Sequence, residues 1–236
     1  MSVPARFVQE YSSSETSEAP SLLVLTFVTG VVDALSVLGF GRVFTANMTG
    51  NVVVLAFGVA GAPGFSMTRS LSALAAFLCG AVLGGGMSRM SCSHRTAWLR
   101  TALICEAVLL FTAAFASFGI QMDAIPSNRL YVLISLTAVA MGLRNATVRR
   151  FAVPDLTTTV LTSTLTGIAA DSSLAGGSNP RIVRRTASVL MMFAGAVLGA
   201  LLLRWGSAPA LLLSGVLVLA TIPGFVKETR LFNTCS

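Results

Sequence analysis

The chain has 236 residues, of which 54% are hydrophobic and only 11% are charged, and its mean hydropathy is +0.81. Soluble domains carry roughly 25% charged residues, so this composition excludes a disordered chain, a nucleic-acid-binding domain and a disulfide-rich secreted module, and predicts a polytopic membrane protein. The net charge of +7 does not indicate nucleic acid, because the arginines lie in short clusters between apolar runs, as loop charges of membrane proteins do.

Residues 1–20 are polar and serine-rich, and they lack the apolar stretch of a signal peptide. We expect them to form a disordered cytoplasmic tail, and residues 227–236 to form a C-terminal tail. Eight apolar runs lie between the tails, at roughly 21–40, 47–61, 69–88, 99–118, 129–148, 154–170, 186–204 and 207–226. Six of them reach or approach the roughly 20 residues that cross a bilayer. The runs at 47–61 and 154–170 are shorter and begin with polar sequence.

The basic residues distinguish two topologies. If all eight runs cross with the N-terminus inside, eight basic residues fall on each side; if the two short runs enter and return, twelve fall inside and four outside. The positive-inside rule favours the second arrangement. We therefore predict an all-α bundle of six spanning helices and two re-entrant or half-spanning helices in the inner or plasma membrane. Both termini and the loops 89–98 and 171–185 are then cytoplasmic, and loop 119–128 is outside. The alternative is eight crossings with a parallel repeat.

The chain also repeats itself. Three stretches recur in the same order at offsets of 112, 113 and 115 residues: GVVDA at 30–34 with GLRNA at 142–146, NMTGN at 47–51 with VLTST at 160–164, and GAVLG at 80–84 and 195–199. Each half, 21–118 and 129–226, reads as helix, short polar-headed segment, helix, helix. Three crossings per half is an odd number, so this pattern predicts an inverted repeat.

Asp33 lies about 12 residues into the first run, roughly 18 Å deep at the rise of a helix. An acid at that depth costs a few kcal/mol, and it shares one helical face with Thr26, Thr29 and Ser36, so we expect this face to point into the bundle. Asp33 then binds a cation, a proton or a polar substrate. The alternative is a structural hub that bonds backbone amides, and the nearest donors in sequence lie in residues 45–51.

The segment TANMTGN at 45–51 supplies Asn47, Thr49, Gly50 and Asn51. Free amides at the start of a short helix suit an anion or a carbonyl group. The same residue types also cap helices, so capping and ligand binding use the same groups here.

The second short segment carries seven hydroxyls within residues 157–166, and Asp155, Thr159, Thr162 and Thr166 fall on one stripe. We expect a polar cavity wall, although such hydroxyls also bond their own helix backbone. Asn145 is the counterpart of Asp33 in the second half, and each is expected beside its own short segment.

The remaining patterns indicate packing more than chemistry. Glu106 is a lone acid in its run, expected to pair with Arg100 or to extend toward the membrane surface, and the alternative is a proton relay. The GxxxG pairs Gly80/Gly84 and Gly195/Gly199 predict close helix packing, within the bundle or in a homodimer. No nucleophile–base pair, metal-ligand cluster or nucleotide motif is present in the sequence, so we expect no enzyme, no cofactor and no metal.

The stretches GVVDALSVLGFGRVFTANMTGNVVV and GLRNATVRRFAVPDLTTTVLTSTLTGIAAD resemble the two signature stretches of the YoaK-like membrane proteins, a family named as a domain of unknown function. The resemblance covers most of residues 21–226 and implies a multi-pass membrane protein without an established substrate. The matching positions are Asp33, Asn47, Thr49, Gly50, Asn51, Asn145 and Thr162. Two departures concern the second half: Arg144 stands where members often have Gln, and Thr162-Ser163 where they often have Thr-Gly.

These patterns together predict a small secondary transporter or permease. A small polar solute or ion, whose identity the sequence does not reveal, would bind between the two short segments. The other expected partner is the lipid bilayer, and no nucleic acid is expected. The alternative is a non-transporting membrane scaffold or accessory protein in which the polar motifs serve capping and packing.

Overall fold

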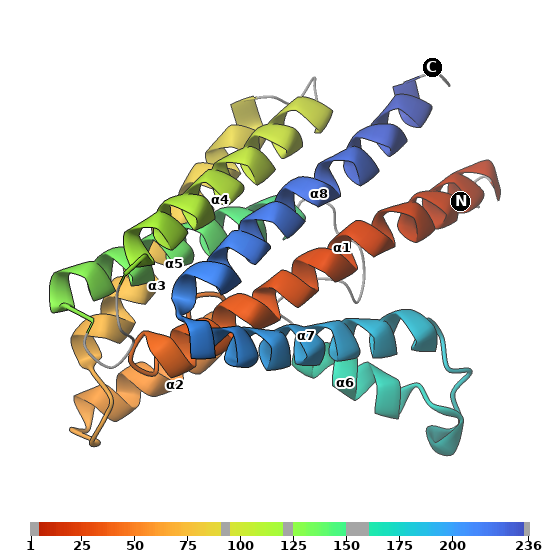
Figure 1. Ribbon diagram of the computed structural model, residues 1–236. Helices are drawn as coiled ribbons and strands as arrows, with labels where there is room; N and C mark the ends of the chain where they lie inside the picture. The colour runs from red at the N-terminus through yellow and green to blue at the C-terminus, as the bar shows by residue number, and fades with distance from the viewer. Residues whose placement is uncertain (1–4, 91–94, 120–124, 150–160, 234–236) are drawn as a thin grey trace.

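The computed structural model of the protein describes residues 5–90, 95–119, 125–149 and 161–233. The regular elements in these ranges are all helical, so the predicted all-α class is confirmed. In chain order they are α1 (Ala5–Gly39), α2 (Met48–Val59), α3 (Met67–Met90), α4 (Arg95–Ser117), α5 (Ser127–Arg149), α6 (Leu161–Ala170), the 3-10 helix η2 (Ser173–Ala175), α7 (Ile182–Leu202), the 3-10 helix η3 (Leu203–Trp205) and α8 (Ser207–Asn233) (Figure 1).

Six of the described helices are long and apolar enough to cross a membrane, namely α1, α3, α4, α5, α7 and α8. The other two are short, with 12 residues in α2 and 10 in α6. At the rise of an α-helix they are about 15–18 Å long, whereas the hydrocarbon core is about 30 Å thick. Over its described residues neither short helix is long enough to cross alone, and six of the described helices reach spanning length, as the six-crossing arrangement predicts.

Two helices extend beyond their apolar runs. α1 begins at Ala5, so residues 5–20 continue the helix where the sequence predicts a disordered tail, and α8 likewise continues through the expected tail to Asn233. Neither glycine nor proline occurs between Ala5 and Ala19. Extending an existing helix costs less than starting a new one, so a polar segment without helix breakers can follow a buried span.

The closest helix packing uses glycines on facing helices. α3 packs along α5, and α1 packs along α7. A Cβ at Gly84 would lie 2.9 Å from the carbonyl oxygen of Leu143, and one at Gly199 would lie 2.7 Å from that of Val31. Gly80 and Gly195 are tighter still, against the backbone carbonyls of Val139 and Phe27. At these four glycines, helices of the same chain therefore approach each other closely.

The facing helices also contribute glycines whose Cα atoms lie against backbone. Gly30 of α1 meets the backbone of Met192, and Gly142 of α5 meets the backbone of Phe77. Each interface therefore has glycine on both sides, which lets the two backbones approach closely.

The other helices complete the bundle around these two interfaces. α8 packs on α4 and α1, and α4 packs on α5. Each short helix packs on the long helix that follows it, α2 on α3 and α6 on α7. The N-terminal end of α1 and the C-terminal end of α8 lie at the same end of the bundle (Figure 1).

Candidate functional site

The Asp33 carboxylate holds the connector between α1 and α2. The chain reverses after α1 at Gly41 and Arg42, which both have positive φ. This turn brings the connector back alongside α1, where Asp33 Oδ1 accepts hydrogen bonds from the backbone N–H of Ala46 (3.0 Å) and Asn47 (3.3 Å). Asp33 is buried. The prediction that Asp33 points inward and contacts residues 45–51 is confirmed.

The polar face predicted on α1 is also inside the bundle. Thr26, Thr29 and Ser36 are all buried, and their hydroxyls donate to backbone carbonyls of the same helix. Back-bonding of this kind satisfies a hydroxyl without a second helix. Two side chains on this face reach other parts of the chain: Asp33 contacts the connector, and Thr29 accepts a hydrogen bond from Arg144 of α5.

Two asparagines organise the start of α2. The Asn47 side chain caps α2 by accepting from Gly50 N (3.4 Å). The Asn51 side chain is buried, donates to Ser70 O (3.0 Å) and accepts from Phe44 N (3.3 Å). Asn51 thus joins the connector to the first turn of α3. Thr49, by contrast, is exposed.

Three buried oxygens around this connector have no hydrogen-bond partner. They are Asp33 Oδ2, Thr45 Oγ1 and Ser70 Oγ. Buried polar atoms are normally bonded, so a group of three in one hydrogen-bonded region is unusual. These three oxygens are therefore the atoms of the site that could bind a ligand.

Replacing Asn51 with Leu is expected to destabilise the protein. The change leaves the Phe44 N–H and the Ser70 carbonyl without the partners that they have in the structure, at about 1–3 kcal/mol for each unsatisfied buried group. The melting temperature of the purified protein in detergent measures this loss. Thr49→Val is the matched control because that side chain is exposed; equal melting of the two variants would contradict the bridging role of Asn51.

Only part of the predicted site in the second half lies within the described residues. Asn145 is half-buried, and its side-chain nitrogen donates to Met141 O of the same helix (2.9 Å). Asp155 and Thr159 lie outside the described residues, so the expected approach of Asn145 to that segment stays a prediction. Thr162 lies on the surface, whereas Thr164 is buried.

Two residues of the predicted hydroxyl stripe, Thr162 and Thr166, lie within α6, and the cavity wall that the stripe predicts stays a prediction. Thr166 is exposed and donates back to Thr162 O (2.9 Å), the structural alternative that such hydroxyls always have. Helix α6 is held to α7 by Arg185, whose Nη1 donates to Gly167 O and to Asp171 Oδ2, both at 2.7 Å.

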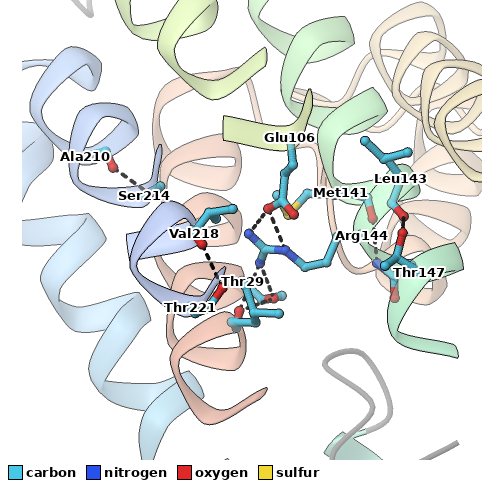
Figure 2. Close-up of polar contacts among 12 residues, drawn as sticks. Thr29, Glu106, Met141, Leu143, Arg144, Thr147, Ala210, Ser214, Val218 and Thr221 are labelled. Carbon is cyan, nitrogen blue, oxygen red and sulfur yellow. Dashed lines mark hydrogen bonds and ion pairs between the residues drawn. The ribbon is translucent and has the colours of Figure 1, made fainter. Parts of the chain in front are cut away.

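A buried ion pair crosses the bundle between α4 and α5. Arg144 donates from Nε to Glu106 Oε1 (2.7 Å), and its Nη2 contacts the same oxygen. Its Nη1 reaches α1, where it donates to Leu25 O (2.9 Å) and Thr29 Oγ1 (3.1 Å) (Figure 2). Both charged side chains are fully buried. One guanidinium therefore ties together α1, α4 and α5.

This pair corrects two expectations. Glu106 pairs with Arg144 and not with Arg100, which is exposed. Arg144 is also no loop charge: it lies five residues inside the end of α5. Without it the six-crossing topology still places eleven basic residues inside against four outside. A signal was available, because a lone acid and an arginine in two apolar runs must find partners within the bundle.

The fold and these sites define the class: a multi-pass α-helical membrane protein whose described residues form six long helices and two short ones. The chain belongs to the family described as "Protein of unknown function (DUF1275)", which matches residues 21–223. It is 35% identical over 156 residues to the UPF0700 transmembrane protein YoaK of Bacillus subtilis (strain 168), and this match covers 65% of each chain. No solved structure matches it. The resemblance seen in the sequence is thereby confirmed.

Proposed function

We propose that the protein is a small secondary transporter or permease of the cell membrane, which carries a small polar solute or ion past Asp33. The observation that carries this proposal is the Asp33 carboxylate itself. It lies buried in a spanning helix, holds the start of a half-length helix with Oδ1, and keeps Oδ2 without a partner. An ionisable group inside a membrane usually marks a transport or relay site.

The second support is the equivalence of the two halves. We compare the two halves by matching α1, α2, α3 and α4 to α5, α6, α7 and α8. The α1–α7 interface then corresponds to the α5–α3 interface, and the α1–α8 contact corresponds to the α5–α4 contact. The tight glycines follow the same exchange: Gly30 with Gly142 at an offset of 112, and Gly80 with Gly195 at 115. Since each half has three long helices, the halves would be inverted, the arrangement that lets transporters alternate access.

A transport experiment tests the proposal. The purified protein is reconstituted in liposomes, and solute-gradient currents are recorded with amino acids, sugars, nucleobases and organic acids as probes. We expect a current for one class, abolished in Asp33→Asn. Asp171→Asn is the control, because it also removes a carboxylate, but one that directly follows α6 and pairs with Arg185. Asn51→Leu separates stability from transport, because it leaves every charge in place.

The scaffold alternative rests on the amide bonds that Asp33 accepts. It predicts that Asp33→Asn lowers the melting temperature. It also predicts no current with any probe for the wild-type protein, and that result would contradict the transporter.

The proposed orientation places both termini in the cytoplasm. Single cysteines at positions 92 and 178, on a background without other cysteines, should both be protected from an impermeant maleimide in intact cells. Residue 92 lies outside the described ranges, whereas residue 178 lies between η2 and α7. The positive-inside rule supports this side for both. Labelling of one position and not the other would overturn the six-crossing topology.

A further inference from the structure

The buried ionisable groups of the described spans do not balance. The charged side chains that are buried are Asp33, Glu106 and Arg144, with exposed fractions of 5%, 1% and 1%. Two of them are acids and one is a base, so with all three ionised this core carries one negative charge. An unbalanced charge in a low-dielectric interior is costly unless it is paired or neutralised.

The structure shows which acid lacks the counterion. Arg144 donates to Glu106 through Nε and Nη2, so that pair is neutral as a unit. Asp33 accepts instead from the backbone N–H groups of Ala46 and Asn47, which carry no net charge. Arg144 attracts Asp33 only through space and donates no hydrogen bond to it, so the uncompensated charge is assigned to Asp33.

The free oxygens of Asp33, of the connector and of the first turn of α3 are of the kind that binds a small hard cation. Oδ2 of Asp33 and the hydroxyls of Thr45 and Ser70 are buried and unpartnered. Thr45 precedes the two amides that Asp33 holds, and Ser70 is joined to the connector through Asn51. Carboxylate and hydroxyl oxygens suit hard cations and not the soft metals that select thiolate or imidazole. A single missing positive charge requires a monovalent one.

We propose that Asp33 binds one monovalent cation on Oδ2, with the hydroxyls of Thr45 and Ser70 as neighbouring oxygen ligands. The cation is a sodium ion or a proton, and either one neutralises the core. Oδ1 keeps its amide bonds in both cases, so binding holds the α1–α2 connector in place. One part of this inference rests on the proposed transport function: if the protein is a transporter, the cation is its coupling ion, and one cation binds per protein.

A binding experiment that needs no transported solute tests the site. The melting temperature of the full chain in detergent is followed while sodium chloride replaces choline chloride or potassium chloride at constant ionic strength, and separately while pH is lowered without sodium. A ligand at about 100 times its Kd should raise the melting temperature by roughly 5–10 °C. Saturable dependence on sodium identifies the ion as sodium, and dependence on pH alone identifies it as a proton.

The variants locate the response. Asp33→Asn should abolish it, and Asp171→Asn should retain it. Thr45→Val and Ser70→Ala each remove one hydroxyl. The backbone carbonyl at position 70, which accepts from Asn51, is unchanged in Ser70→Ala. If the ion is sodium, each variant should weaken its binding by about tenfold, as expected for the loss of roughly one hydrogen bond. If the ion is a proton, each variant should shift the midpoint of the pH response.

Three results would overturn the inference. They are a wild-type protein that responds to neither ion, a response that persists unchanged in Asp33→Asn, and an unchanged titration in Thr45→Val. The last result decides the question even if Asp33→Asn fails to accumulate. Cation binding without solute currents would refute the transporter and leave this site intact. Currents that depend on neither sodium nor pH would refute this site and leave the transporter intact.

Discussion

Glu106→Gln is expected to cost about 3–5 kcal/mol of folding free energy, because it leaves the buried guanidinium of Arg144 without a counter-charge. Arg144 cannot turn to water, since its side chain is fully buried and also bonds Leu25 O and Thr29 Oγ1 of α1. The loss should appear as a lower melting temperature and a lower yield of monodisperse protein in detergent.

Arg100→Gln is the matched control, because Arg100 lies on the same helix as Glu106 and is exposed. Exposed charges contribute about 0–1 kcal/mol, so this variant should melt close to the wild type. The double variant Glu106→Leu/Arg144→Met removes both charges, and buried pairs replaced in this way are often neutral in stability. If Arg100→Gln were the more damaging of the two single changes, the assigned pairing would be wrong.

Gly142→Ala and Gly30→Ala are expected to destabilise the protein by similar amounts, about 1–3 kcal/mol or more. The new methyl group of each meets backbone atoms of the facing helix, at Phe77 for Gly142 and at Met192 for Gly30. Backbone cannot rotate away as a flexible side chain can, so the helices must separate. The free energy of unfolding in mixed detergent measures the cost.

Gly86→Ala provides the control for helix propensity. Gly86 is also a helical glycine, but a Cβ there has open space within 4 Å. Alanine is favoured over glycine in a helix by about 1 kcal/mol, so this variant should match or exceed the wild type in stability. Equal penalties at Gly30 and Gly142 would support the proposed equivalence of the halves, and a penalty at Gly86 as large as theirs would contradict the packing argument.

The site around Asp33 was accessible from the sequence because its parts are close along the chain. Only 13 residues separate Asp33 from Ala46, the nearer of its two donors. An acid inside an apolar run must find donors, and the segment after the next turn supplies them. Asn47 as a helix cap follows from the same local chemistry. The joining of Asn51 to Ser70 is less local, and it emerged only from the packing of α2 on α3.

The sequence by itself determined the membrane class, the six long and two short helices, and the close packing at the GxxxG glycines, because these depend on run length and residue size. The tertiary structure decided the pairing of Arg144 with Glu106, 38 residues away, and with Leu25, 119 residues away. It also decided that Thr162 faces outward. The physical reason is the solvent: lipid and protein interior are both apolar, so a spanning helix lacks the polar–apolar alternation that reveals its inner face. Which polar groups meet then depends on how the helices pack.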